Sequence, residues 1–355
     1  MKMNLQKNKT IQPLLGEKKG WNLAVEILLF IVVFFVCSLG QGIVILPAEI
    51  VALFTNEAYL AAVEAGDMVA VAEASVAAVS NEGFMTISLI AEIVMIAITL
   101  GFCVLFEKRN PRKVGFTKGN FAKEYGMGLV AGFAFFSVAV LIAMLTGSMK
   151  LSYQGGGAIL ILFAIGFMIQ GMAEEVLCRG YLMCSVSRRY PLWVGVVTNA
   201  VVFAALHLLN AGISVLAFVN LVLFGIFASL YFIRRGNIWG IGAFHSVWNF
   251  VQGNFYGIQV SGNSKMTSVL SSTFDESKEL INGGAFGLEG GIAVTIVMVV
   301  GIVLLYLEPW KKTLKLSETG SVMETEAEQV MEPEAELEAE LETEEMPEAD
   351  QEEDE

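Results

Sequence analysis

Charged residues and cysteines are scarce in this chain of 355 residues. Only 16% of the residues are Asp, Glu, Lys or Arg, against about 25% in a typical soluble domain, and 55% are hydrophobic. This balance excludes an ordinary soluble domain. The four cysteines lack the paired spacing of a disulfide framework or a zinc ribbon. We expect all of them to be packing residues: Cys37, Cys103, Cys178 and Cys184.

Signatures of several enzyme classes are also absent. No Walker, Rossmann or nucleic-acid-binding pattern occurs, and the apolar stretches lack the GxSG, GxGD and HExxH motifs. We therefore predict neither nucleotide-driven chemistry nor a nucleic-acid partner.

Long apolar stretches, by contrast, are abundant. A membrane-spanning helix needs ~20 mostly apolar residues. Eight stretches approach that length, at about 22–46, 84–106, 125–146, 158–188, 192–209, 213–233, 237–252 and 291–307. The sequence predicts an all-α fold class: a polytopic membrane helix bundle with about eight transmembrane helices.

The basic residues predict the orientation of these spans, because cytoplasmic loops are enriched in Lys and Arg. With the N-terminus in the cytoplasm, 19 of the 22 basic residues fall in cytoplasmic segments. The external segments then hold only Lys150, Lys265 and Lys278. We expect an integral, multi-pass protein of the plasma membrane with both termini in the cytoplasm.

The net charge of −14 is concentrated at the C-terminal end. Residues 317–355 contain 18 of the 36 acidic residues and no Lys or Arg. Such a segment cannot bury enough apolar surface to fold. We predict a disordered, solvating tail, with docking to an unknown partner as the alternative. At the other end, the apolar run after the basic N-terminus is too long for a signal peptide and predicts an uncleaved first span.

Polar side chains interrupt the apolar stretches in one part of the chain. The only two histidines, His207 and His245, lie in hydrophobic segments, and the pair Glu174-Glu175 follows the apolar run 158–170. Ionisable groups at membrane depth are costly and are usually functional. Three short patterns contain these groups: Glu174-Glu175-x-x-x-Arg179, Phe203-x-x-x-His207 and His245-x-x-x-Asn249.

Helical spacing predicts which of these side chains are neighbours. Glu175 and Arg179 are four residues apart and share a helix face, so an ion pair would explain a buried arginine. Glu174 is rotated by ~100° from Glu175 and is free to meet other helices. His245 and Asn249 place a proton carrier and an amide donor on one face.

Spacing also predicts that the three patterns meet in space. The turn between the fourth and fifth spans falls at Tyr190-Pro191, because proline disfavours a continuing helix. Glu174 lies 16 residues before Tyr190, and His207 lies 16 after Pro191. In an antiparallel hairpin both lie ~24 Å from the turn, and His245 lies ~12 Å into its span from the same side. We expect one cavity that is reached from the cytoplasmic half.

Carboxylate, imidazole and amide groups suit peptide hydrolysis, which needs an activated water, a proton relay and a stabilised oxyanion. The patterns resemble those of the CPBP family of intramembrane proteases, which includes the Rce1-like CAAX prenyl proteases and the Abi and bacteriocin-processing proteins. The family carries EExxxR, FxxxH and HxxxN/D on successive core helices, and all three stand here in order. The resemblance covers roughly residues 155–252.

The resemblance implies an intramembrane endopeptidase, a hydrolase that cleaves a membrane-associated or lipidated protein or peptide. By resemblance, Glu174 activates water with the assistance of His207. His245 and Asn249 form the oxyanion hole, and the acid–arginine pair of the first pattern supports the site. The candidate catalytic residues are Glu174, Glu175, Arg179, His207, His245 and Asn249.

No cofactor is assured for this site. Glu174, His207 and His245 also match the two-histidine, one-carboxylate set that binds catalytic zinc. A divalent metal such as zinc is therefore the alternative to a metal-free glutamate mechanism, which we favour. The expected partners are membrane lipid and a membrane-associated protein or peptide substrate.

The basic stretch 108–123 is either a topology signal or a site that attracts anionic lipid, and the sequence leaves both open.

These features divide the chain into six segments. The predicted segments are a cytoplasmic basic N-terminus (1–20), transmembrane helices with an external loop at 48–82 (21–154), the CPBP-like catalytic core (155–252), an external loop (253–290), a last transmembrane helix (291–310) and the acidic tail (311–355).

Other interpretations of the buried polar groups remain open. They could form a structural hydrogen-bond network that joins helices. A proton-coupled transporter also keeps Glu and His in mid-membrane, although no inverted repeat is visible in this sequence. A non-catalytic immunity or membrane-scaffold protein would keep the same fold without hydrolysis.

Overall fold

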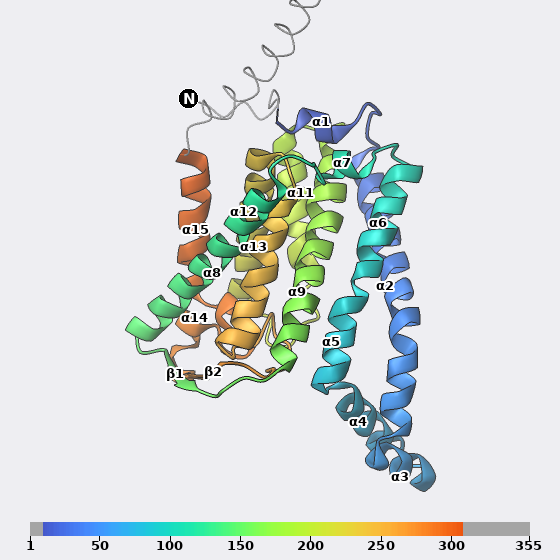
Figure 1. Cartoon of the computed structure of the whole chain (residues 1–355), viewed down its shortest axis with the longest axis vertical. Helices are drawn as coiled ribbons and strands as arrows, with labels where there is room; N and C mark the ends of the chain where they lie inside the picture. The colour runs from blue at the N-terminus through green and yellow to red at the C-terminus, as the bar shows by residue number, and fades with distance from the viewer. Residues whose placement is uncertain (1–9, 308–355) are drawn as a thin grey trace, which may run out of the picture. The chain divides into compact units, whose positions relative to one another are not determined.

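The computed structural model describes residues 10–307, and all but the last two of these belong to a unit formed by Met1–Leu305. The predicted acidic tail and the first nine residues lie outside the described part. The helices (Figure 1) are α1 (Gln12–Leu15), α2 (Leu23–Phe54), α3 (Glu57–Ala65), α4 (Met68–Val79), α5 (Glu82–Ala91), α6 (Ile93–Leu105), α7 (Pro111–Val114), α8 (Phe121–Leu145), α9 (Ile159–Glu175), α10 (Cys184–Ser187), α11 (Leu192–Ala205), α12 (Val215–Arg235), α13 (Trp239–Phe250), α14 (Glu279–Asn282) and α15 (Ile292–Leu307). Two π-helical segments, Val176–Met183 and Val251–Phe255, continue α9 and α13. Three 3₁₀ turns lie at Glu276–Lys278, Gly284–Phe286 and Leu288–Gly290.

The helices confirm a polytopic membrane fold. In the described part of the chain, five segments are long and apolar enough to cross a membrane: Leu23–Phe54, Glu82–Leu105, Phe121–Leu145, Ile159–Ser187 and Val215–Arg235. Three of the eight predicted spans correspond to shorter helices, because α11, α13 and α15 have 14, 12 and 16 residues. α11 ends at Ala205, before the predicted end of its span, and α13 changes to a π-helix after Phe250.

The first span is longer than predicted. α2 continues through Pro47 to Phe54, so the predicted external loop 48–82 begins inside a helix. A proline removes one hydrogen bond of the helix, and the apolar residues around it favour continuing in the membrane. The rest of this loop forms α3 and α4. Asn56 and Asp67 cap these helices by accepting hydrogen bonds from backbone N–H groups of the first turn.

A small sheet accompanies the predicted all-α content. β1 (Met149–Tyr153) pairs with β2 (Leu270–Phe274) in antiparallel fashion, with Leu151 opposite Ser272. The Ser272 hydroxyl also donates to the carbonyl oxygen of Gly257 at 2.7 Å. The strand pairing ties the residues after α8 to the segment 253–290, which the sequence predicts as an external loop, and the Ser272 bond links two parts of that segment. That segment is thereby held against the helices.

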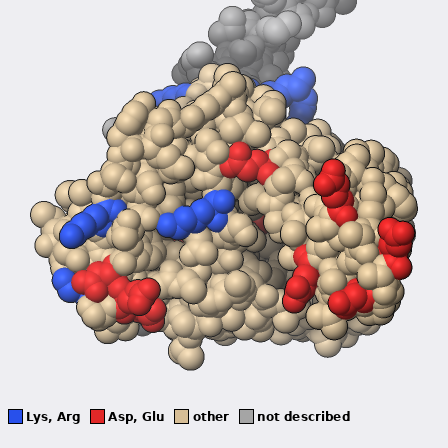
Figure 2. All heavy atoms as spheres, turned by 90° about the horizontal axis from the view of Figure 1, so that it is seen from below, with Lys and Arg blue, Asp and Glu red and all other residues tan. Residues whose placement is uncertain are grey.

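The surface of the bundle is largely apolar. On the face seen in Figure 2, the Lys, Arg, Asp and Glu side chains form small separate groups on a mostly uncharged surface. Large apolar side chains are exposed on the long helices, for example Phe35 on α2 (61% exposed) and Val130 on α8 (72%). Extended apolar surfaces of this kind mark contact with a membrane.

α13 lies at the centre of the bundle and packs against α8 and α9. Glycines on α8 allow this close packing. A Cβ atom on Gly128 would lie 2.1 Å from the carbonyl oxygen of Gly240, and one on Gly132 would lie 2.5 Å from that of Phe244. Small residues four apart are the common means by which membrane helices approach closely. The helix that carries His245 is thus pressed against the bundle by backbone contact.

α9 makes similar contacts on two sides. A Cβ on Gly171 would lie 2.5 Å from the backbone nitrogen of Ser246 on α13. A Cβ on Gly166 would lie 2.8 Å from the Cβ of Leu89 on α5. α9 is therefore fixed between α13 and α5, which positions the polar residues at its C-terminal end.

The glycine contact between α8 and α13 can be tested with Gly128→Ala. The added methyl group overlaps the backbone of α13, and overpacking of this kind costs about 1–3 kcal/mol. We expect a lower midpoint of thermal unfolding in detergent. The matched control is Gly126→Ala on the same helix, because a Cβ there meets no described atom within 4 Å. Equal midpoints for the two variants would contradict the packing argument.

Candidate active site

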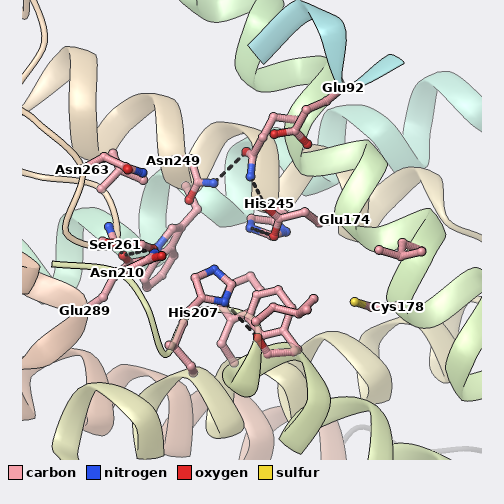
Figure 3. A pocket seen from close by; sticks show the side chains of 18 of the residues that line it. Glu92, Glu174, Cys178, His207, Asn210, His245, Asn249, Ser261, Asn263 and Glu289 are labelled. Atoms are coloured by element: carbon pink, nitrogen blue, oxygen red, sulfur yellow. Dashed lines mark hydrogen bonds and ion pairs between the residues drawn. The ribbon is translucent and has the colours of Figure 1, made fainter. Parts of the chain in front are cut away.

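A cavity of about 340 Å³ lies between α2, α5, α9, α11, α12, α13 and the segment 253–290. Four of the six predicted site residues line this cavity (Figure 3): Glu174, His207, His245 and Asn249. The other two, Glu175 and Arg179, do not line it, and their side chains are 0% exposed. The structure therefore brings the three sequence patterns together, in two layers.

The layer behind the cavity is a buried charge cluster of Glu175, Arg179 and His245. Nη1 of Arg179 donates to Oε1 of Glu175 at 2.9 Å, as the spacing predicts. The same oxygen lies 2.9 Å from Nδ1 of His245 and accepts a hydrogen bond when that nitrogen is protonated. α9 ends at Glu175 and continues as the π-helix that contains Arg179. Single π-helical turns within α-helices are frequent at functional sites.

Phe203 joins the three patterns. The guanidinium carbon of Arg179 lies 4.7 Å from the centre of the Phe203 ring, within the range of a cation–π interaction. The ring centres of His207 and His245 lie 4.9 Å and 6.0 Å from that of Phe203. The aromatic residue of the second pattern therefore contacts the arginine of the first and both histidines.

In the layer that faces the cavity, amide side chains orient Glu174. Nδ2 of Asn249 donates to Oε1 of Gln170 at 2.9 Å, and Nε2 of Gln170 donates to Oε1 of Glu174. The other carboxylate oxygen of Glu174, Oε2, lies 3.7 Å from Nε2 of His245. Oε1 of Glu174 therefore accepts a hydrogen bond from the Gln170 amide, while Oε2 lies near the imidazole of His245.

His207 lies just beyond the end of α11, in the turn that follows Ala205. Its Nδ1 lies 2.8 Å from the carbonyl oxygen of Phe203. Because a carbonyl oxygen only accepts, Nδ1 carries the proton. In the neutral ring, Nε2 then has a lone pair that can accept a proton.

Three of the polar cavity-lining residues that sequence analysis missed bear on the chemistry: Glu92, Gln170 and Glu289. Two of them had a detectable signal. Gln170 is a polar residue one helical turn before Glu174, and Glu92 is the one acidic residue within the apolar stretch 84–106. Glu289 lies in a predicted loop, where an acidic residue is unexceptional.

Glu289 closes one end of the cavity. Its Oε1 accepts a hydrogen bond from Nε1 of Trp248 at 3.0 Å. Its Oε2 accepts from the backbone N–H and the hydroxyl of Ser261 at 2.9 and 2.8 Å, and from Nε2 of Gln252 at 3.2 Å. Trp248 precedes Asn249 on α13, so these bonds hold that helix against the segment 253–290.

The side chains of the site do not form a metal-binding cluster. Among residues 10–307, no group of three or more His, Cys, Asp or Glu side chains has the arrangement needed to hold a metal ion. In the proposed zinc set, His245 directs one ring nitrogen to Glu175, and its other nitrogen lies 3.7 Å from Glu174. The choice between zinc and a metal-free glutamate mechanism stays a prediction.

One comparison with known proteins gives a family. Residues 156–251 match a family model described as type II CAAX prenyl endopeptidase Rce1-like, and this segment contains all three patterns. The resemblance that the patterns predict is thereby confirmed for this part of the chain, and the matched family is one of proteases. No curated protein and no solved structure matches the chain.

The buried charge cluster can be tested with Arg179→Ala. The substitution leaves the carboxylate of Glu175 buried without its cation, and breaking a buried pair in this way costs about 3–5 kcal/mol. We expect a strongly lowered unfolding midpoint, measured with a thiol-reactive dye, because all four cysteines are buried and free. Adding Glu175→Gln should restore part of the loss. The exposed Arg189 supplies the control, Arg189→Ala. An unchanged midpoint for Arg179→Ala would contradict the role of the cluster.

Proposed function

We propose that this integral membrane protein, whose residues 156–251 match the type II CAAX prenyl endopeptidase family, is an intramembrane endopeptidase of the glutamate type. One observation supports this proposal above the others. Glu174, His207, His245 and Asn249 surround one cavity, although they come from α9, the turn after α11 and α13. A network built only for structure would not need a cavity of about 340 Å³ beside its carboxylate.

Glu174 is the proposed general base. Its carboxylate lies at the cavity surface, with a side chain that is 21% exposed, whereas Glu175 is inaccessible. A water in the cavity can give its proton to the Oε2 atom of Glu174, and the oxygen of that water then attacks the carbonyl carbon of the peptide bond. Nε2 of His207 faces the same cavity and can relay the proton to the leaving amine.

His245 and Asn249 are the proposed oxyanion donors. Asn249 uses one amide hydrogen for Gln170, which leaves its second N–H for the substrate. Nδ1 of His245 lies 2.9 Å from Oε1 of Glu175, which fixes the orientation of the ring, and the doubly protonated imidazole carries a second N–H at Nε2. Nε2–H of that form can donate to the oxygen that becomes negative in the transition state. Such donors act strongly because they are oriented before the reaction begins.

The proposed substrate is a membrane-associated or lipidated peptide segment whose scissile bond enters from the cytoplasmic half of the bilayer. This direction rests on the predicted orientation, with both termini in the cytoplasm of a plasma-membrane protein. We propose a mechanism without a metal ion, in which Glu174 alone activates the water.

Comparing protein termini in cells tests the function. We expect new termini in membranes that contain the wild-type chain and none with Glu174→Gln or His207→Ala at equal membrane levels, because both variants lose the proton-transfer group. Identical termini, while the wild type produces a phenotype, would contradict proteolysis. Stoichiometric zinc in the purified protein, whose removal abolishes cleavage, would contradict the metal-free mechanism alone.

The oxyanion assignment is tested separately with Asn249→Ala. Loss of one oriented donor should lower kcat by about 10²–10³ with little change in KM. The readout is the cleavage rate of a peptide that spans the bond found in the previous experiment. Equal rates for Asn249→Ala and the wild type would refute the assignment.

A further inference from the structure

The cavity has a one-sided charge distribution. Three glutamates line it, Glu92, Glu174 and Glu289, and none of its described lining residues is Lys or Arg. A cavity lined by acidic groups attracts cations and repels anions. The three carboxyl groups differ in whether their oxygens already have partners.

Two of the three glutamates are committed to other residues. Both carboxylate oxygens of Glu289 accept hydrogen bonds, from Trp248 and Ser261 among others. Glu174 accepts a hydrogen bond from Gln170 and lies beside His245. The second oxygen of Glu174, Oε2, is the atom proposed to take the proton of the attacking water, so we do not assign it to a cation.

Glu92 is different, because its Oε2 atom is buried and has no hydrogen-bond partner among the described residues. The residue lies at the junction of α5 and α6, near the middle of the span Glu82–Leu105. A buried carboxyl group without a partner is costly at this depth. An unpaired carboxyl group in a cavity wall is therefore most simply explained by a ligand that supplies its partner.

Helix packing places Glu92 close to the reacting groups. α5 and α9 touch where Leu89 meets Gly166. Glu92 is three residues after Leu89, and Gln170 is four after Gly166, so both lie about one turn past this contact. In Figure 3, Glu174 and His245 lie between Glu92 and His207.

We infer that Glu92 binds a basic side chain of the substrate, a Lys or Arg close to the scissile bond. The inference rests on the proposed function and names the substrate class of that same site. A Lys or Arg has an apolar stem that suits the aromatic and aliphatic walls of the cavity, and its cationic head would pair with the free carboxylate. The endopeptidase would then select membrane-associated segments that carry a basic residue beside the cleaved bond.

Peptide binding tests this inference without requiring turnover. The protein is the full chain with Glu174→Gln, in nanodiscs of uncharged phosphatidylcholine, so that membrane charge does not contribute. The probes are palmitoylated 12-residue peptides of Ala, Leu and Ser in which one position, scanned along the peptide, is Lys, Gln or Glu. We expect the best Lys peptide to bind about tenfold more tightly than its Gln counterpart, and the Glu peptide to bind most weakly.

Substitution of Glu92 gives the second half of the test. Adding Glu92→Gln should remove the difference between the Lys and Gln peptides, and Glu92→Lys should make the Glu peptide the tightest. The control is Glu73→Gln on α4, which removes an exposed carboxylate outside the cavity and should leave the preference intact.

Equal binding of Lys and Gln peptides at every position would overturn the inference. A preference that survives Glu92→Gln would also overturn it. The comparison among peptides uses a chain with an intact Glu92, so it holds even if substitutions at this position impair folding. A preference for Lys in a chain that cleaves nothing in cells would support this binding site while contradicting the proposed hydrolysis. Cleavage in cells without a preference for the Lys peptide would support the proposed hydrolysis and contradict this binding site.

Discussion

The buried cluster of Glu175, Arg179 and His245 is the interaction on which the rest of the structure depends. Three ionisable groups in an apolar bundle are tolerated only when they neutralise one another. Oε1 of Glu175 meets both Arg179 and His245 at 2.9 Å, so the register of α9 against α13 is fixed at one position. Because Glu175 is turned into this cluster, the adjacent Glu174 is turned toward the cavity. The same contact that stabilises the bundle therefore exposes the carboxylate proposed to act on water.

The glycines of α8 and α9 make this contact possible. Gly171 lies one helical turn before Glu175, and it brings the backbone of α9 against Ser246, the neighbour of His245. On the opposite side, Gly128 lets α13 approach α8 to backbone contact. A Cβ at either position would overlap the backbone of α13, so a larger residue requires the helices to shift. The charged groups of the site therefore depend on the same glycines that allow the helices to pack closely.

The cavity separates the groups proposed for chemistry from those proposed for substrate selection. The base lies on α9, His207 in the turn after α11, and His245 and the amide donor on α13. The opposite wall comes from α2 and the α5–α6 junction, where Glu92 has an unpartnered oxygen. Glu289 closes a third side from the segment 253–290.

Local spacing in the sequence predicted much of this site. The Glu175–Arg179 pair follows from helix geometry, because side chains four residues apart share a face whatever surrounds them. The proline turn at Pro191 predicted that Glu174 and His207 lie at similar depth, and both line one cavity. The apolar stretches predicted the membrane helices for a similar reason, since hydrophobicity is a property of the residues themselves.

Tertiary structure decided the features that depend on the register between distant segments. Gln170 bridges Asn249 and Glu174 only because α9 and α13 are packed at one rotation. The buried Oε2 atom of Glu92 has no hydrogen-bond partner among the described residues, a feature that depends on which side chains the packing places beside it. The β1–β2 pairing likewise joins segments far apart in the chain. A sequence specifies which groups are present and how neighbours along a helix are spaced, whereas side-chain partners across helices are set by packing.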